Sequence, residues 1–301
     1  MTSQWPSVAN PGGAPFVKKE VEALRQAGVN VDVFLYTGGW SPSNYLRAVR
    51  QLHRQLDSKQ YDLVHVRFGQ SGLVGRAQWK LPVVITYGGS DIEGSPVFRG
   101  RHRYRNFVLI GVSRLLSLLA DEVIVVSDHL GRKLPRRSYH IIPSGIDLDL
   151  FQPYDMQEAR RKLNLPVDKK LVLFIGDPSK PTKRFELADR ACQIAEEFID
   201  LMLINIYKLP QTLVPWYMSA CNALILTSTN EGSPNVVKEA LACNLPVVAV
   251  DVGDIRERIG SNNSCAIATD SAEALSEALV RVLNIPLRPQ LRDLVANITN
   301  E

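Results

Sequence analysis

The strongest constraint on how this chain can fold is the repeated alternation of short apolar runs with longer amphipathic stretches. The runs are rich in β-branched residues and apolar on both faces, which is typical of parallel strands covered by helices on each side. Candidate strands lie at 29–35, 62–68, 82–87, 122–127 and 139–143 and, after a break, at 171–176, 201–206, 223–228, 246–250 and 265–269. Candidate helices lie at 15–27, 44–58, 155–164, 184–198, 211–220 and 271–283.

Because strands and helices alternate in two successive series, the sequence predicts the α/β class with two Rossmann-like, doubly wound domains. A length of 301 residues agrees with about two domains. The polar, proline-bracketed segment "PSGIDLDLFQP" (143–153) separates the two series, and we place the domains at 1–147 and 148–301. In such folds a ligand binds at the carboxyl ends of the strands.

The first series shows an irregularity at its start. In a βαβ unit the turn "NPGG" and the helix after it should follow a strand, but only about eight residues precede this turn. The sequence therefore predicts that the first strand of the N-terminal domain is missing or very short.

Composition excludes several classes of protein. The chain is 45% hydrophobic and 22% charged, as expected for a soluble globular protein. It contains neither the roughly 18-residue apolar run of a membrane-spanning helix nor a signal-peptide pattern, so we expect a cytoplasmic location. The four cysteines form no Cys-x-x-Cys pair, which favours reduced, buried thiols over a metal site or disulfides.

The charge is unevenly distributed. Residues 1–150 contain 19 Lys and Arg against 12 Asp and Glu, a net charge of +7, whereas the remainder contains 16 against 19. The excess lies in "RGRHRYR" (99–105) and "RKLPRR" (132–137). A solvated face accounts for such runs as well as an anionic acceptor or an acidic membrane does. Nucleic acid is not expected, because no recognisable binding module accompanies the charge.

The stretch "EGSPNVVKEALACNLPVVAV" (231–250) carries the clearest chemistry. It follows a strand pattern and opens a helix, with Ser233 as the expected N-cap and Pro234 at the first helical position. The backbone N–H groups of Asn235 and Val236 are then free at the positive end of the helix dipole, which suits a diphosphate.

Two carboxylates bracket this helix start. Glu231 in the loop can accept hydrogen bonds from hydroxyl groups beside the phosphates, and Glu239 inside the helix can accept from both hydroxyls of a ribose. A sugar, a diphosphate and a ribose in that order describe a nucleotide sugar.

This stretch resembles the Glu-x7-Glu motif of retaining GT-B glycosyltransferases of family 4. Further segments resemble that family in its own order, namely "NPGGAPFVKKEVEALRQAGVNVDVF", "ITYGGSDIEG", "VIVVSDHL", "IIPSGIDLDLF", "FIGDPSKPTKRFELADRA" and "WYMSACNALILTS". The resemblance therefore covers nearly the whole chain. It implies the GT-B fold, with two Rossmann-like lobes facing across a cleft.

The resemblance also implies roles for particular residues. It places Glu231 and Lys183 at the catalytic centre, and it puts Gly88, Asp91 and Arg67 on the acceptor side. The donor-binding residues that it implies are Glu239, Gly232, Ser233, Pro234, Asn235, Val236, Arg184, Gly12 and Gly13. Catalysis would rest on stabilising the charge of the leaving diphosphate, with Lys183 as the main cation and Arg184 or Lys180 as the second.

No cofactor and no metal are expected. The "DLD" of Asp147 to Asp149 copies a metal motif of the other glycosyltransferase fold, but it lies in the connector between the domains. The chain also departs from the family pattern. Gly88 and Arg67 stand where histidines are common, and Asn222 stands where an aspartate is common, which puts rate or donor choice in question rather than fold.

These observations favour a retaining, metal-independent glycosyltransferase that moves a sugar from a nucleoside-diphosphate sugar to an unidentified acceptor. The short start of the chain predicts weakened turnover, so a catalytically silent nucleotide-sugar-binding or scaffold protein is the alternative, and a nucleotide-sugar epimerase is a third. A lipid-linked or anionic acceptor and peripheral association with the inner membrane face are hypotheses based on the basic first domain.

Overall fold

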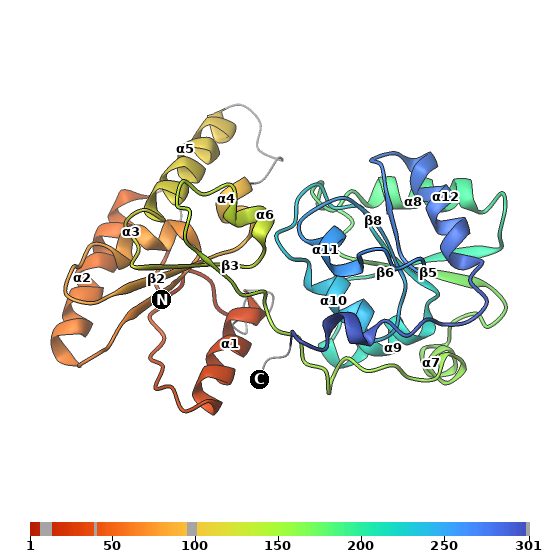
Figure 1. The fold of residues 1–301 in the computed structure, drawn as a ribbon, viewed down its shortest axis with the longest axis horizontal. Coiled ribbons are helices and arrows are strands. Elements are labelled where there is room, and N and C mark those ends of the chain that lie inside the picture. The colour runs from red at the N-terminus through yellow and green to blue at the C-terminus, as the bar shows by residue number, and fades with distance from the viewer. Residues whose placement is uncertain (7–13, 39–40, 95–100, 299–301) are drawn as a thin grey trace. The chain divides into compact units, whose positions relative to one another are not determined.

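The structure, a computed structural model, describes residues 1–6, 14–38, 41–94 and 101–298 and divides into two compact units (Figure 1). Unit 1 comprises Met1–Ser144 and unit 2 comprises Gly145–Thr299. The division lies three residues before the boundary placed at Asp147. Each unit is built around one parallel sheet with helices packed against it.

Unit 1 has the strand order β1-β2-β3-β4. Its strands are β1 (Val64–Arg67), β2 (Val83–Tyr87), β3 (Glu122–Val125) and β4 (His140–Ile141). Its helices are α1 (Pro15–Gln26), α2 (Pro42–Ser58), α3 (Gly72–Gly75), α4 (Gly89–Glu93), α5 (Arg101–Leu116) and α6 (Asp128–Gly131), and a 3₁₀ turn, η1, spans Gly69–Ser71.

The beginning of the chain lies beside β1. Met1 exchanges backbone hydrogen bonds with His65 and Arg67, and Thr2 does so with Phe34 and Tyr36. Thr2 and Leu35 therefore form an isolated parallel bridge instead of two full strands. The strand expected at 29–35 is wrong except at Leu35, because its neighbour offers only one residue to pair with and an extended segment needs a partner along its length.

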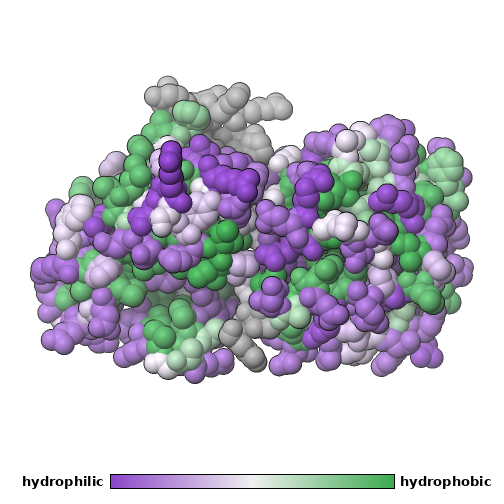
Figure 2. Space-filling model, viewed as in Figure 1, coloured by the Kyte–Doolittle hydropathy of each residue, from purple (hydrophilic) through white to green (hydrophobic). Residues whose placement is uncertain are grey.

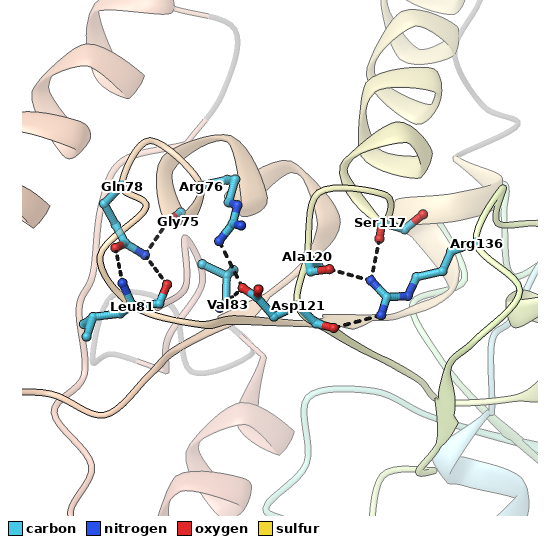
Figure 3. Close-up of polar contacts among 9 residues, drawn as sticks. All are labelled: Gly75, Arg76, Gln78, Leu81, Val83, Ser117, Ala120, Asp121 and Arg136. Atoms are coloured by element: carbon cyan, nitrogen blue, oxygen red, sulfur yellow. Dashed lines mark hydrogen bonds and ion pairs between the residues drawn. The ribbon is translucent and has the colours of Figure 1, made fainter.

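The amino ends of β2 and β3 are held together by one carboxylate (Figure 3). Asp121 Oδ2 accepts from Val83 N at 2.7 Å and from Arg76 Nη1 at 3.0 Å. Asp121 N donates to Val83 O at 2.9 Å, and Asp121 O accepts from Arg136 Nη2 at 2.8 Å. These contacts lie at the amino ends of the strands. They therefore stabilise the fold and leave the carboxyl ends of the strands free for loops.

Unit 2 has the strand order β6-β5-β7-β8-β9, all parallel. Its strands are β5 (Lys170–Ile175), β6 (Leu201–Ile206), β7 (Ala223–Leu226), β8 (Val247–Val250) and β9 (Ala266–Ala268). Its helices are α7 (Met156–Leu163), α8 (Phe185–Ala195), α9 (Val214–Ala220), α10 (Asn235–Ala242), α11 (Ile255–Ile259) and α12 (Ala272–Leu283). Two 3₁₀ turns, η2 (Gln211–Leu213) and η3 (Arg292–Val295), complete it.

Alternate residues of β5 serve two different cores. Leu171 and Leu173 pack in the cluster that contains residues of α9, α10 and η3, whereas Val172 and Phe174 pack in the cluster that contains residues of α8 and α12. A strand covered on both faces must be apolar at every position. This explains why the runs that predicted the sheet show no polar alternation.

All four cysteines are free and buried, as the sequence predicts for structural thiols. Burial raises the pKa of Cys221 to about 12, so its thiol stays protonated at neutral pH. No helix in the described part of the chain combines the length and the apolar character needed to cross a bilayer.

Candidate active site

The chain changes direction within the sheet of unit 2 at one point. From β5 it passes to β6 on one side and then crosses to β7 on the other. The loops that leave β5 and β7 therefore diverge, and the crevice between them at the carboxyl ends is where ligands bind in sheets of this order. Lys183 lies in the first of these loops, and Glu231 lies in the second.

These two residues meet in the structure. Lys183 Nζ lies 2.6 Å from Glu231 Oε1 and 3.5 Å from Ser228 Oγ. The two charged side chains are 31% and 20% exposed, so they are partly desolvated yet reachable by a solute. The structure thus brings together the two side chains that the sequence predicts to be catalytic.

Two contacts hold the loops in register. The Thr227 hydroxyl donates to Lys183 O at 2.8 Å, and Thr229 N donates to Thr182 O at 2.9 Å. Because these are main-chain acceptors, the contacts fix the path of the β5–α8 loop independently of its side chains. The Lys183 side chain is thereby placed beside the loop that carries Glu231.

Arg184, the predicted second cation, points elsewhere. Its backbone is left-handed, with φ of 51°, and its guanidinium donates to Thr227 O at 2.5 Å and to the Asp270 carboxylate. Arg184 therefore ties the start of α8 to the end of β7 and has an acidic partner of its own. A role on the diphosphate stays a prediction.

The helix α10 begins one residue later than the sequence predicts. Pro234 is its N-cap, with ψ of 114°, and the helix starts at Asn235. The Ser233 hydroxyl does not cap the helix, because it donates to Asp254 Oδ2 at 2.8 Å, and a buried carboxylate is the stronger acceptor. The N–H groups of Asn235 and Val236 have no hydrogen-bond partner among the described residues, as an anion site at this end requires.

Glu239 lies inside α10 and is half-buried, one turn beyond these free N–H groups. Gly232, Ser233 and Pro234 form the turn between Glu231 and the helix. The predicted donor-binding residues of this segment are therefore contiguous around one helix start. Gly12 and Gly13, which the resemblance places near the donor phosphate, lie outside the described residues.

The loop after β8 supports this turn, and the sequence analysis did not identify it. Gly253 has φ of +60°, and a Cβ placed on it would lie 2.8 Å from the carbonyl oxygens of both Glu231 and Gly232. Its neighbour Asp254 is 1% exposed and accepts from Ser233 and from Arg258 Nε at 2.9 Å. The signal available in the sequence was a glycine three residues after the end of a buried strand, in "VVAVDVGD".

Gly253→Ala is expected to displace the Glu231–Gly232 backbone, because both the left-handed φ and the close carbonyls oppose a side chain. We expect a loss of about 1–3 kcal/mol in the free energy of unfolding, together with weakened binding of nucleoside diphosphates. Urea unfolding and calorimetry measure the two effects. Gly260→Ala is the matched control, since Gly260 also has a positive φ, +53°, but has open space around it. Equal behaviour of the two variants would show that Gly253 does not support the turn.

In unit 1 the predicted acceptor-side residues lie at the carboxyl ends of β1 and β2. Asp91 is 5% exposed, and its Oδ2 accepts from Gly88 N at 2.9 Å at the start of α4. Burial raises the pKa of Asp91 to about 6, although hydrogen bonds from backbone N–H groups oppose the shift. Arg67 Nη1 pairs with Glu20 Oε2 at 3.1 Å, so Arg67 joins β1 to α1.

Asn222 stands where the family commonly has an aspartate, and its side-chain oxygen still accepts hydrogen bonds from the neighbouring donors. Its Oδ1 accepts from Arg160 Nη2 and from Leu171 N, both at 2.8 Å. In the described part of the chain no three metal-ligating side chains gather into a possible ion site.

Two parallel-sheet units of this kind define the GT-B class of protein, and solved structures share the fold. Sucrose-phosphate synthase from Thermosynechococcus elongatus matches with a TM-score of 0.82 and 22% identity over 99% of this chain and 92% of that chain. Anabaena HepE in complex with UDP-glucose matches with a TM-score of 0.75 and 17% identity over 99% of this chain and 94% of that chain.

The family models identify the chain more closely. "Glycosyltransferase Family 4" matches residues 7–150, and "Glycosyl transferases group 1" matches residues 160–284. The chain therefore belongs to the group 1 and family 4 glycosyltransferases, with one model matching each half. This confirms the family and the GT-B fold class that the sequence predicts, whereas the retaining mechanism stays a prediction.

Curated relatives agree with this assignment. A putative teichuronic acid biosynthesis glycosyltransferase, TuaC, of Bacillus subtilis is 28% identical over 73% of this chain and 61% of that protein. A D-inositol 3-phosphate glycosyltransferase of Geodermatophilus obscurus is 27% identical over 79% of this chain and 63% of that protein. The chain thus spans about three fifths of the length of these relatives.

Proposed function

We propose that this chain is a retaining, metal-independent glycosyltransferase that moves a sugar from a nucleoside-diphosphate sugar to an acceptor. The observation that carries the proposal is the Lys183–Glu231 pair beside the free N–H groups of α10, at the switch point of the sheet. HepE, a relative in fold, is described as a complex with UDP-glucose, which supports a nucleotide sugar as the donor.

The diphosphate would bind at the start of α10, where Asn235 and Val236 offer N–H groups at the positive end of the helix dipole. Lys183 would turn from Glu231 toward the phosphates and stabilise the negative charge that develops as the bond to the anomeric carbon breaks. Glu231, relieved of this partner, would accept from hydroxyl groups of the transferred sugar. Glu239 would accept from the ribose hydroxyls.

In this scheme the acceptor hydroxyl attacks on the face from which the diphosphate leaves. The acceptor oxygen forms the new bond to the anomeric carbon, and its proton passes to an oxygen of the departing diphosphate. The configuration at the anomeric carbon is retained. Lys183 and the positive end of the α10 dipole would stabilise the negative charge of the leaving diphosphate without a metal ion. For this reason we propose metal independence.

A nucleoside diphosphate is expected to raise the melting temperature of the protein, because it binds the folded site alone. At a ligand concentration of about 100 times Kd the gain in free energy of unfolding is about 2.7 kcal/mol, which corresponds to a shift of several degrees. Thermal-shift measurements with UDP, GDP, ADP and dTDP, each with and without EDTA, test this and identify the base. A shift that disappears with EDTA would contradict metal independence, and no shift with any of the four would contradict donor binding.

A catalytically silent nucleotide-sugar-binding protein is the second candidate. One observation favours it, namely Gly88 in place of a family histidine. A panel of nucleotide sugars offered with simple glycosides separates the two functions, since a silent protein gives the thermal shift without any product.

The basic first half of the chain supports a further part of the proposal. A net charge of +7 over residues 1–150 suits an anionic or lipid-linked acceptor. It also suits a cytoplasmic protein that associates peripherally with the inner face of an acidic membrane. Transfer to an extractable lipid fraction, measured with a labelled donor, tests the acceptor class.

A further inference from the structure

One charged side chain of the helix α10 is buried inside unit 2. Hydrophilic residues are spread over the surface of this unit (Figure 2), where charged groups keep their hydration. Lys238 differs from them, because it lies in the first turn of α10 and is only 1% exposed. An ammonium group loses its hydration when it is buried, so its burial is costly unless negative charge lies near it. The position of Lys238 therefore requires an explanation.

The carboxylate of Asp254 is the group that attracts Lys238 most strongly. Asp254 is itself 1% exposed, and its Oδ2 accepts from Ser233 Oγ at 2.8 Å and from Arg258 Nε at 2.9 Å. Its Oδ1 is buried without a hydrogen-bond partner among the residues that the structure describes. A buried carboxylate oxygen without a donor needs positive charge nearby, and Lys238 supplies part of it.

The charges around Lys238 leave it with an incomplete counter-charge. Asp254 is shared between Lys238 and Arg258, and Arg258 disfavours the ammonium. Glu239 of the same helix also attracts Lys238, but more weakly. Arg292 of η3, which packs on α10 as well, donates to a backbone carbonyl at the carboxyl end of the helix. Two cations therefore depend mainly on one buried carboxylate.

The pKa of Lys238 reflects this imbalance. Burial lowers it from the ordinary value of 10.5 to about 8, and Arg258 acts in the same direction, although Asp254 and Glu239 oppose the shift. The side chain is thus mostly charged at neutral pH, but the groups of the protein alone stabilise its charge poorly. An anion bound at the start of α10 would add the missing negative charge.

We propose that Lys238 is a positioning residue for the nucleotide donor. It holds Asp254, and through Asp254 the Ser233 hydroxyl, in the turn that precedes α10, and it adds positive charge to the first turn of the helix where the diphosphate binds. The inference rests on the proposed function, because it requires the diphosphate at this helix start. The diphosphate in turn stabilises the buried ammonium, so binding raises the pKa of Lys238.

The first test uses the unchanged protein and one nucleoside diphosphate, selected from UDP, GDP, ADP and dTDP by its thermal shift. Calorimetry in two buffers of different ionisation enthalpy gives the number of protons taken up on binding. We expect a larger uptake at about pH 8.5, where Lys238 is partly neutral, than at about pH 7. The affinity should fall about tenfold as the pH rises through this range and beyond, since one unit of pKa shift corresponds to a factor of ten.

Lys238→Met keeps the length of the side chain and removes its charge. At about pH 7 this variant should bind the same ligand about tenfold more weakly than the unchanged protein does, and its affinity should vary less with pH. Ionisation of the ligand affects both proteins equally, so their difference reports on Lys238. Lys169→Met is the control, since Lys169 precedes β5, is 37% exposed and pairs with Asp200 at 3.0 Å. We expect the control to bind and titrate like the unchanged protein.

Three results would overturn the inference. The first is a proton uptake by the unchanged protein that is no larger at about pH 8.5 than at about pH 7. The second is Lys238→Met with unchanged affinity and pH profile and a lower melting temperature, which would make Lys238 a structural residue. Both results leave the proposed function intact. The third is no binding of any of the four ligands by the unchanged protein, which would contradict the donor site as well. If Lys238→Met does not fold, the proton uptake of the unchanged protein decides alone.

Discussion

Glu231→Gln is expected to lower the rate of sugar transfer by a factor on the order of 10²–10³, the usual cost of removing one group that stabilises a transition state. The amide keeps the shape of the side chain but loses the charge that pairs with Lys183 Nζ at 2.6 Å. It therefore accepts less strongly from the sugar hydroxyls. Stability should change little, because a partly exposed pair contributes only about 0–1 kcal/mol.

The direction of the binding change distinguishes this role from a structural one. Glu231→Gln removes a negative charge from the proposed diphosphate site, so nucleoside diphosphates should bind as well as before or more tightly. Lys183→Met should weaken the same ligands, because it removes the cation. Calorimetry with a nucleoside diphosphate, next to steady-state kinetics with the donor sugar, measures both changes.

Glu257→Gln is the control, since Glu257 is an exposed glutamate on α11 and should leave both quantities unchanged. The proposed role of Glu231 is wrong if Glu231→Gln loses activity only in proportion to the fraction of protein that unfolds. It is also wrong if Lys183→Met leaves the binding of diphosphates unaltered.

Arg288→Met is expected to lower the free energy of unfolding of unit 2 by about 3 kcal/mol, because hydrogen bonds to a charged donor contribute about 1.5–3 kcal/mol each and only some can be replaced by water. The guanidinium makes five of them, to Met218 O, Ser219 O, Cys221 O, Cys243 O and Asn244 O, at 2.7–3.1 Å. These carbonyls lie at the carboxyl ends of α9 and α10. Arg288 thus caps two helices at their negative ends.

Burial lowers the pKa of Arg288 to about 10, so the side chain stays charged at neutral pH. It can therefore donate charged hydrogen bonds to the carboxyl ends of both α9 and α10. Methionine keeps most of the aliphatic stem, which limits the loss to the hydrogen bonds. Arg281→Met on α12 is the control, since Arg281 is exposed. If urea unfolding gives the same midpoint for both variants, the carbonyls are satisfied by water, and the capping role is wrong.

Much of this fold could be predicted because the apolar runs that mark its strands depend only on neighbouring residues in the sequence. β5 needs apolar residues on both faces, and the run "LVLFIG" meets that need whatever lies next to it. The segment 29–35, "VNVDVFL", has the alternating apolar residues of a half-exposed strand but forms only the bridge at Leu35. A strand requires a neighbour of matching length, and the neighbour here is Thr2. The length of a partner is not encoded in the run itself.

The candidate site, too, could be predicted only where its features depend on adjacent residues. The spacing of Glu231 and Glu239 around a turn and a helix start could be identified from adjacent residues. The preference of Ser233 for Asp254, 21 positions away, could not. Nor could the engagement of Arg184 by Asp270, 86 positions away. Side chains at a helix start choose between the helix N–H groups and any stronger acceptor that the fold brings near.

The sequence by itself determined the α/β class, the two series of strands, the family, and the placement of Glu231, Glu239 and Lys183 in segments that follow strands. It could do so because apolar periodicity and a contiguous motif depend only on neighbours in the chain. The tertiary structure alone decided that β5 and β7 are adjacent, so that Lys183 meets Glu231, and that Gly253 lies under the turn between them. It also decided which hydrophobic side chains stay in solvent, Phe107 and Leu115 of α5 among them, because exposure depends on what the folded chain leaves uncovered.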